Sequence, residues 1–413
     1  MPIISIFSGG FCQEGAVTEE VVALTGYRLI TDDEIVGVAS RRSTLAEAKI
    51  NRAFSSKTSV FNKFTLEKER SLAFLKLAVA DLITTDNALI TNFSGQLIPA
   101  AVSHTLRVCL IAPQKYRIAA AAEQQGLSEK DAAKLVQRLE EDCSFWIDSL
   151  LGNSDPWDPA LYDIVIPVDK MSAQAAAALI ADYAGKDIIQ QTAESKQALQ
   201  DFRLATTTAT ALVQQGHTVE VSAKNGAITL TINKHVLMLN RLQEELKSIA
   251  EPIAGVKSVV TKIGKDFHKT DIYRKHDFEM PSKVLLVDDE REFIQTLSER
   301  LIMRDMGSAV AYDGESALNL IKEDEPEVII VDLKMPGVDG LEVLRKVKKT
   351  RPEIEVIILT GHGHEADRQL CMELGAFAYL QKPLDINVLS ETIQKANEKI
   401  RRKKDKKDRK FGD

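Results

Sequence analysis

The sequence predicts an α/β protein with two parallel sheets and a small α+β unit between them. Short apolar runs alternate with helix-like segments in the first and last thirds of the 413 residues, which is typical of parallel sheets covered by helices on both faces. Over residues 219–232, apolar and polar residues alternate on either side of Asn225-Gly226, the strongest short signal of a β-hairpin. The chain length allows this number of folded regions.

In the last third, four apolar runs are each followed directly by polar side chains. The runs cover residues 284–287, 328–331, 354–359 and 377–380. The side chains that follow them are the carboxylates of Asp288, Asp289 and Asp332, the hydroxyl of Thr360 and the amine of Lys382. Because the carboxyl ends of parallel strands meet at the ligand-binding edge of such a sheet, we expect these five groups to lie close together.

These carboxylates predict a magnesium site beside a phosphorylated aspartate. A phosphoryl group on Asp332 adds negative charge next to other carboxylates, and a divalent cation must offset that charge. Mg²⁺ prefers hard oxygen ligands. We expect these ligands from Asp289 and Asp332, from Asp288 through water, and from the backbone carbonyl of Lys334.

Residues 283–400 resemble, from end to end, the receiver domain of two-component response regulators. The likeness is carried by the acidic pair 288–289, the Asp-x-Lys-Met-Pro-Gly loop at 332–337, Thr360-Gly361, the run 375–379 and Lys382-Pro383. The resemblance implies a doubly wound (βα)₅ fold, a sensor histidine kinase as partner and Asp332 as the phosphoacceptor. It also implies a cis peptide bond before Pro383.

The side chains of Thr360, Lys382 and Tyr379 are expected to respond to the phosphoryl group. Thr360 can donate a hydrogen bond to a phosphoryl oxygen, and Lys382 can pair with it electrostatically. The resemblance implies that Thr360 and Tyr379 rotate together as the readout of phosphorylation. A homodimer formed through this segment is a further expectation.

Residues 2–25 predict a strand, a glycine-containing loop and a helix, which is the layout of a phosphate-binding loop. Gly10 and Gly15 have the glycine spacing of that motif. Ala16 and Val17, however, stand where the motif has Lys followed by Ser or Thr. We therefore treat Gly10, Gly15, Ala16 and Val17 as a degenerate nucleotide loop.

The charges around this loop oppose phosphate binding. No Lys or Arg occurs in residues 1–27, whereas Glu14 lies in the loop and Glu19 and Glu20 lie on the helix behind it. Phosphoryl transfer depends mostly on positioning and on charge neutralisation. We expect no catalytic residues in this region.

Residues from about 1 to 185 resemble the cytidylate-kinase-like family of P-loop kinases. The likeness rests on the opening strand, loop and helix and on residues 26–35, 111–118 and 157–166. Where the family has Gly-Arg, this chain has Asn92-Phe93, and the family's lid-helix arginine is missing from residues 142–146. Arg117 is retained. We expect a degenerate kinase fold; retained weak activity, or an architecture with no link to nucleotides, are the alternatives.

Asp32 and Asp33 are expected to cap a helix N-terminus, and a remnant of a nucleoside contact is the alternative. We place the end of this first domain at residue 190. Residues 191–263 form a helix followed by an α+β module that resembles a BON domain, which implies partner contact or, as the weaker alternative, membrane contact. Residues 264–282 are expected to be a linker.

Composition limits the remaining function classes. Net charge is −7, and residues 283–400 carry 15 Lys and Arg against 23 Asp and Glu, whereas 401–413 form a basic tail with 8 against 3. Without a basic domain or a helix-turn-helix pattern, we expect no DNA binding. The four cysteines form no C-x-x-C pair, and no stretch is long and apolar enough to span a membrane. These features predict a cytoplasmic protein.

The hypothesis that follows is a response regulator that uses Mg²⁺. A histidine kinase would phosphorylate Asp332, and the switch would change how the degenerate kinase-like domain meets an unidentified protein or small ligand. The main alternative is a phosphorylation-gated nucleoside monophosphate kinase of the CMP type that uses ATP. A third is a scaffold or phosphate sink, in which the other domains only localise the receiver-like segment.

Overall fold

The structure is a computed structural model that describes residues 2–410, except for positions 44, 57, 58, 85, 86, 235, 237, 238, 266, 268–282, 303, 305, 362 and 363. The chain divides into two compact units. The first comprises Met1–Thr58 and Glu67–Arg274, and the second comprises Ser59–Leu66 and Lys275–Asp413. The linker expected at 264–282 lies almost wholly outside the described residues.

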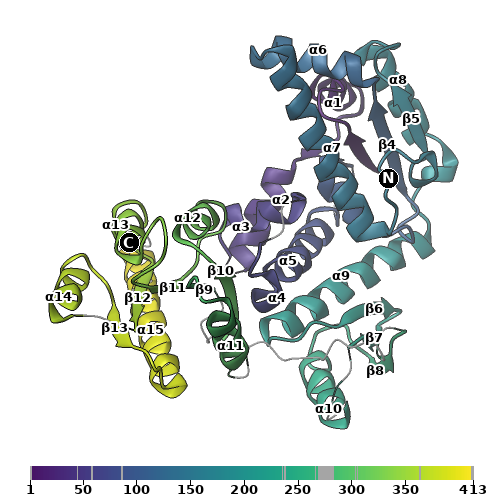
Figure 1. The fold of residues 1–413 in the computed structure, drawn as a ribbon. Coiled ribbons are helices and arrows are strands. Elements are labelled where there is room, and N and C mark those ends of the chain that lie inside the picture. The colour runs from purple at the N-terminus through teal and green to yellow at the C-terminus, as the bar shows by residue number, and fades with distance from the viewer. Residues whose placement is uncertain are drawn as a thin grey trace. The chain divides into compact units, whose positions relative to one another are not determined.

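The first unit contains a five-stranded parallel sheet in the order β2-β3-β1-β4-β5. Figure 1 labels its strands β4 and β5. Its strands are β1 (Ile3–Ser8), β2 (Arg28–Ile30), β3 (Ala88–Thr91), β4 (Thr105–Ile111) and β5 (Ile164–Pro167). Because β1 is the central strand, the loop that follows it lies in the middle of the carboxyl edge, as a phosphate-binding loop would.

Alternate side chains of β1 pack on opposite faces of this sheet, as the two-residue period of a strand requires. Ile4 and Ile6 lie in a cluster with α1 (Glu14–Thr25) and α8 (Ala173–Ala184). Ile3 and Phe7 lie in a second cluster with side chains of the other layer, namely α2 (Asp32–Arg42), α5 (Glu67–Leu82) and α7 (Glu129–Leu151). The predicted parallel sheet with helices on both faces is confirmed.

The remaining elements of this part of the first unit lie between these strands and helices in the chain. They are α3 (Glu47–Asn51), α6 (Gln114–Gln125) and the 3-10 helices η1 (Arg52–Phe54), η2 (Asn92–Leu97), η3 (Pro159–Leu161) and η4 (Asp187–Ile189). The predicted capped start at Ser128 is confirmed, since its Oγ accepts from the Asp131 amide at 3.2 Å.

A three-stranded mixed sheet follows in the first unit. It consists of β6 (Glu220–Lys224), β7 (Ala227–Ile232) and β8 (Ser258–Ile263), with α9 (Ala193–Gln214) before it and α10 (Leu239–Ala250) inserted before β8. The predicted hairpin is confirmed: Asn225 and Gly226 have φ of 52° and 87°, as a tight turn with two left-handed residues requires. Helix α9 also contributes Leu199 and Phe202 to the core formed with α5.

The second unit contains a parallel sheet in the order β10-β9-β11-β12-β13. The strands are β9 (Val284–Val287), β10 (Ser308–Ala311), β11 (Val328–Asp332), β12 (Glu355–Thr360) and β13 (Ala378–Gln381). The helices are α11 (Arg291–Ile302), α12 (Gly314–Glu323), α13 (Gly340–Thr350), α14 (Glu365–Glu373) and α15 (Ile386–Lys410). This strand order and the alternation with helices confirm the predicted doubly wound (βα)₅ fold.

A short segment from early in the chain takes part in the core of the second unit. Phe61, just before α4 (Asn62–Thr65), has 0% of its surface exposed and packs in the cluster that contains Leu285 and Ile321. Ser59 donates a hydrogen bond from Oγ to Asp324 at 2.6 Å. The receiver-like sheet therefore uses residues that the sequence analysis assigned to another domain.

A buried carboxylate lies at the opposite, amino-terminal edge of this sheet. Glu355 is 0% exposed. Its oxygens lie 2.9 Å from Lys399 Nζ, 3.0 Å from Lys403 Nζ and 3.6 Å from Lys348 Nζ. These three ammonium groups hold the pKa of Glu355 below its usual value despite burial. Two of them come from α15, so the carboxylate fixes that helix against β12.

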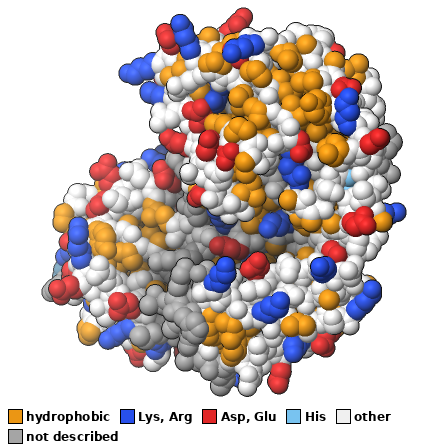
Figure 2. Space-filling model, turned by 90° about the vertical axis from the view of Figure 1, so that its right-hand side faces the viewer, with side chains coloured by type: hydrophobic (Ala, Val, Ile, Leu, Met, Phe, Trp, Pro, Cys, Tyr) orange, Lys and Arg blue, Asp and Glu red, His pale blue; other side chains and the backbone are white. Residues whose placement is uncertain are grey.

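Charge is mixed on the surface. On the face shown in Figure 2, the described Lys and Arg side chains are interspersed with Asp and Glu and form no continuous basic surface. No helix among the described residues combines the length and the apolar character needed to cross a membrane.

Candidate functional site

Two carboxylates and an amine meet at the carboxyl edge of the second unit's sheet. Asp288 follows β9, Asp332 ends β11 and Lys382 follows β13. The Lys382 Nζ lies 2.6 Å from Asp288 Oδ2 and 3.0 Å from Asp332 Oδ1. The structure thus brings these predicted site residues together, although they are separated by up to 94 positions.

Burial and charge act against each other at this cluster. Asp288 and Asp332 are 2% and 6% exposed. Burial raises the pKa of Asp288, although the hydrogen bond from Lys382 pulls it down. Burial lowers the pKa of Lys382, but the hydrogen bonds to Asp288 and Asp332 outweigh it and leave the pKa above its usual value. The ammonium is therefore held in its charged form between the two carboxylates.

The residues present fit a magnesium ion. Asp288 and Asp332 direct hard carboxylate oxygens to one position that already attracts a cation, and Asp289 is an exposed neighbour. Lys334 places its backbone beside Asp332, since its amide donates to Asp332 Oδ2 at 2.8 Å. Among the described residues, no three His, Cys, Asp or Glu side chains converge closely enough to hold a metal by themselves.

Thr360 and Tyr379 lie on neighbouring strands near the cluster. Thr360 ends β12 and is 1% exposed, while Tyr379 lies in β13 and packs partly buried against the core. Burial raises the pKa of the Tyr379 hydroxyl, against the opposing effect of the Thr360 side chain. The peptide bond between Lys382 and Pro383 is cis, as the resemblance implies.

Two contributors to this site were missed at the sequence level. Phe293 places its ring 4.3 Å from Lys382 Nζ, so a cation–π contact adds to the two carboxylates. Gly340 begins α13 where a Cβ would come within 2.1 Å of the Asp332 carbonyl oxygen. Only glycine allows this close approach, and the Asp339-Gly340 pair before a helical pattern was the available signal.

The phosphate-loop segment of the first unit is held in place by contacts with neighbouring elements. Phe11 and Gln13 have φ of 65° and 55°, a left-handed conformation that is uncommon for residues other than glycine. Gln13 Nε2 lies 2.5 Å from Tyr116 Oη and 3.1 Å from the Val168 carbonyl. Arg117 Nε donates to the Gly10 carbonyl at 2.9 Å. Side chains of α6 and a backbone carbonyl just after β5 therefore fix this loop.

The four loop residues singled out from the sequence have ordinary structural roles. A Cβ on Gly10 would come within 2.5 Å of Leu139, so this glycine permits a close approach to α7. Gly15 and Ala16 are exposed in the first turn of α1. Val17, in place of a metal-binding hydroxyl, is 0% exposed in the core under the sheet.

A carboxylate takes part in the loop where a cation is expected in an active kinase. Glu14 begins α1 and accepts a hydrogen bond from Ser8 Oγ at 2.8 Å. Burial raises its pKa, and the nearby Asp32 raises it further against the effect of Ser8. The loop therefore presents an acid to any incoming phosphate.

The expected capping role of Asp32 and Asp33 was wrong. Helix α2 begins at Asp32, and its N-cap is Thr31, whose hydroxyl accepts from the Glu34 amide at 3.3 Å. Asp32 accepts instead from the amides of Phe93 and Ser94, at 3.1 and 3.0 Å, at the start of η2. A long-range contact has replaced the local one, and burial raises the pKa of Asp32 to about 6.

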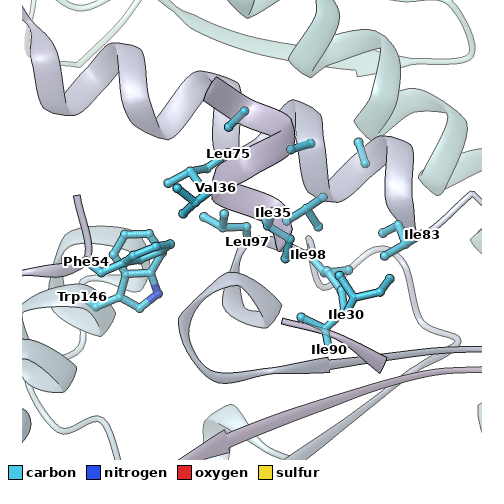
Figure 3. Packing of buried hydrophobic residues seen from close by; sticks show 14 of the residues in the cluster. Ile30, Ile35, Val36, Phe54, Leu75, Ile83, Ile90, Leu97, Ile98 and Trp146 are labelled. Carbon is cyan, nitrogen blue, oxygen red and sulfur yellow. The ribbon is translucent and has the colours of Figure 1, made fainter. Parts of the chain in front are cut away.

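An aromatic cluster occupies the region where the chain departs from the kinase pattern. The Trp146 indole donates to the Phe93 carbonyl at 2.9 Å, and the two rings lie 5.9 Å apart. Phe54 stacks on Phe93 at 5.4 Å. It also meets Trp146 edge-on at 5.0 Å (Figure 3). Phe7 lies 6.0 Å from Phe93. The missing arginines are thus replaced by one packed aromatic core, which the sequence analysis did not foresee.

The retained cation Arg117 is engaged within the protein. It is 4% exposed, and its Nη1 lies 2.6 Å from Glu140. Lys115, another basic residue of α6, is exposed. Arg117 supports the loop by its bond to Gly10 and is neutralised by Glu140.

Two family matches accord with this geometry. Residues 284–394 match the response regulator receiver domain family, and residues 3–170 match the cytidylate kinase-like family. These matches support a receiver domain in the second unit and a cytidylate-kinase-like domain in the first.

Similar solved structures include three receiver domains. A receiver domain protein from Clostridium thermocellum is 38% identical over 30% of this chain and 96% of that one, with a TM-score of 0.28. A CheY-like receiver protein from Methanospirillum hungatei JF-1 is 25% identical over 29% and 96%, with a TM-score of 0.29. The receiver domain of the Francisella response regulator 1452 is 29% identical over 29% and 98%, with a TM-score of 0.28.

Proposed function

We propose that this protein is a phosphorylation switch in which Asp332 accepts a phosphoryl group from a sensor histidine kinase. The single observation that carries the proposal is the pairing of Lys382 with both Asp288 and Asp332 at the carboxyl edge of the receiver sheet. In the transfer, an Asp332 carboxylate oxygen forms a bond to phosphorus while the bond between phosphorus and the donor nitrogen breaks.

The side chains around Asp332 have complementary roles in this proposal. Asp288, Asp289, Asp332 and the Lys334 carbonyl would hold Mg²⁺, which would offset the negative charge that the phosphoryl group brings. Lys382, already charged and 3.0 Å from Asp332, pairs with a phosphoryl oxygen. Thr360 and Tyr379 then report the modified state to partners through β12 and β13.

The first unit is the output side of the switch rather than an enzyme. Glu14 in the loop, the pairing of Arg117 with Glu140 and the aromatic cluster at Phe93 all oppose the alternative of a nucleoside monophosphate kinase. The helix-strand-strand-helix-strand order of residues 193–263 supports a BON-like module used for protein contact or spacing. We propose a protein or small ligand as the partner of this unit.

Labelling of the full-length protein tests the proposal. Incubation with acetyl phosphate and Mg²⁺ should give an acid-stable, hydroxylamine-sensitive acyl phosphate that maps to Asp332. Asp332→Asn should remove it. Asp385→Asn, at an exposed aspartate of the same unit, should label like the wild type. Full labelling of Asp332→Asn would refute the assignment.

A further inference from the structure

A cavity of about 400 Å³ in the first unit is separate from the phosphorylation site. It lies between the phosphate-loop segment, the start of α6 and the residues that follow β5, and its size falls in the range of about 300–1,000 Å³ that small-molecule sites occupy. The walls are mainly apolar. Their apolar members include Ile111, Pro113, Trp157 and Pro167.

Two residues that line this cavity carry polar atoms without a hydrogen-bond partner. Arg117 uses Nε on the Gly10 carbonyl and Nη1 on Glu140, but its buried Nη2 finds no acceptor among the described residues. The buried Oδ1 of Asp169 likewise finds no donor in that part of the chain. Buried polar groups are normally paired, so each of these atoms is a place where a ligand can gain a hydrogen bond.

The charges around the cavity cancel. Arg117 is balanced by Glu140 at 2.6 Å, and Asp169 is followed by the exposed Lys170, which also lines the cavity. A polyanion such as a nucleoside triphosphate would meet no surplus of positive charge here. A ligand with no net charge, one acceptor and one donor matches both unpaired atoms.

The geometry points to a binding site for a small zwitterion of the amino-acid class. Its carboxylate would accept a hydrogen bond from Arg117 Nη2, and its ammonium would donate one to Asp169 Oδ1, while Arg117 keeps its bonds to Gly10 and Glu140. Its apolar side chain packs on the Trp157 ring and the two prolines. This site would give the first unit a small ligand of its own, independent of phosphorylation at Asp332.

Thermal-shift and calorimetric measurements on the full-length protein test this inference. The panel consists of the twenty common amino acids, together with cytidine and MgATP. We expect at least one apolar or aromatic amino acid to raise the unfolding temperature of the first unit. Its analogues lacking the carboxylate or the ammonium should bind at least about tenfold more weakly, since each loses one charged hydrogen bond.

Asp169→Asn keeps the shape of the cavity wall and removes the charge that the ammonium needs. It should weaken the amino acid about tenfold and leave the analogue without an ammonium unchanged. Asp187→Asn, at an exposed aspartate outside the cavity, is the matched control and should bind like the wild type. The inference is overturned if no amino acid binds, if binding survives Asp169→Asn, or if only cytidine or MgATP binds. None of these outcomes affects the labelling of Asp332.

Discussion

The two parallel sheets of this protein place a candidate site at the same topological position, but the cation near each site has different partners. At the edge of the receiver sheet, the ammonium of Lys382 lies between Asp288 and Asp332. At the edge of the first sheet, Glu14 occupies the loop, and Arg117 is tied to Glu140. A fold therefore preserves the location of a site, while a few charges decide whether phosphate chemistry can occur there.

Metal removal should have the largest effect and would break the comparison if it failed. Labelling of the receiver by acetyl phosphate should fall below detection in excess EDTA and in Asp289→Ala, because no divalent ion then offsets the charge of the phosphoryl group. Glu292→Ala, at an exposed carboxylate of α11, should label normally. Labelling that persists in EDTA would show that the carboxylates do not form a metal site.

Removal of one ring from the aromatic cluster tests how much that cluster stabilises the first unit. Trp146 is 1% exposed and donates to Phe93, so Trp146→Ala should lower the free energy of unfolding of the first unit by about 3–5 kcal/mol. Circular dichroism during urea unfolding measures this, with Leu24→Ala at an exposed position as control. Labelling at Asp332 should not change. A decrease in the free energy of unfolding of less than about 1 kcal/mol would mean that the cluster does not act as a hydrophobic core.

The pH dependence of the first unit should reveal the partly buried carboxyl of Asp32. Its pKa is raised to about 6 from 3.8, so the unfolded chain ionises first as the pH rises. The free energy of unfolding should therefore fall as the pH rises from 3.8 to about 6. The loss is on the order of 1–2 kcal/mol once the partial exposure of Asp32 is considered. Asp32→Asn should flatten the unfolding temperature across pH 4–7, relative to the wild type. An unchanged slope would contradict the raised pKa.

Restoring a lysine to the loop should have the smallest effect. Ala16→Lys adds the cation that the motif expects, but Glu14 stays in the loop and Gln13 still holds it through Tyr116. We expect weak or no MgATP binding by calorimetry and no turnover with CMP and ATP, as for the wild type. A dissociation constant in the micromolar range would show that one missing charge alone had silenced the domain.

The meeting of the receiver residues at one sheet edge was predictable because each of them is marked locally in the sequence. Asp288, Asp332, Thr360 and Lys382 each follow an apolar run, and the rule for parallel sheets brings the ends of such runs together. The contribution of Phe61 was not predictable. Nothing in residues 59–66 indicates a receiver, and the segment's role depends on a contact with residues more than two hundred positions away.

The first unit shows the converse limit. The absence of the loop lysine at Ala16 could be read directly, and so could the substitution at Asn92-Phe93. The packing of Phe93 with Phe54 and Trp146 could not be predicted from the sequence. The three residues come from separate elements, and only the tertiary fold brings them together. Asp32 was misassigned for the same reason, since a local cap and a long-range acceptor look alike in sequence.

The Glu355 cluster determines where the receiver can be cut. The family match ends at residue 394, yet a fully buried carboxylate depends on Lys399 and Lys403 beyond that point. A fragment that stops at 394 leaves Glu355 with Lys348 alone, 3.6 Å away, and an under-neutralised buried charge is strongly unfavourable. A truncated form of the receiver should therefore retain the chain at least through Lys403, so that Glu355 keeps its ammonium partners.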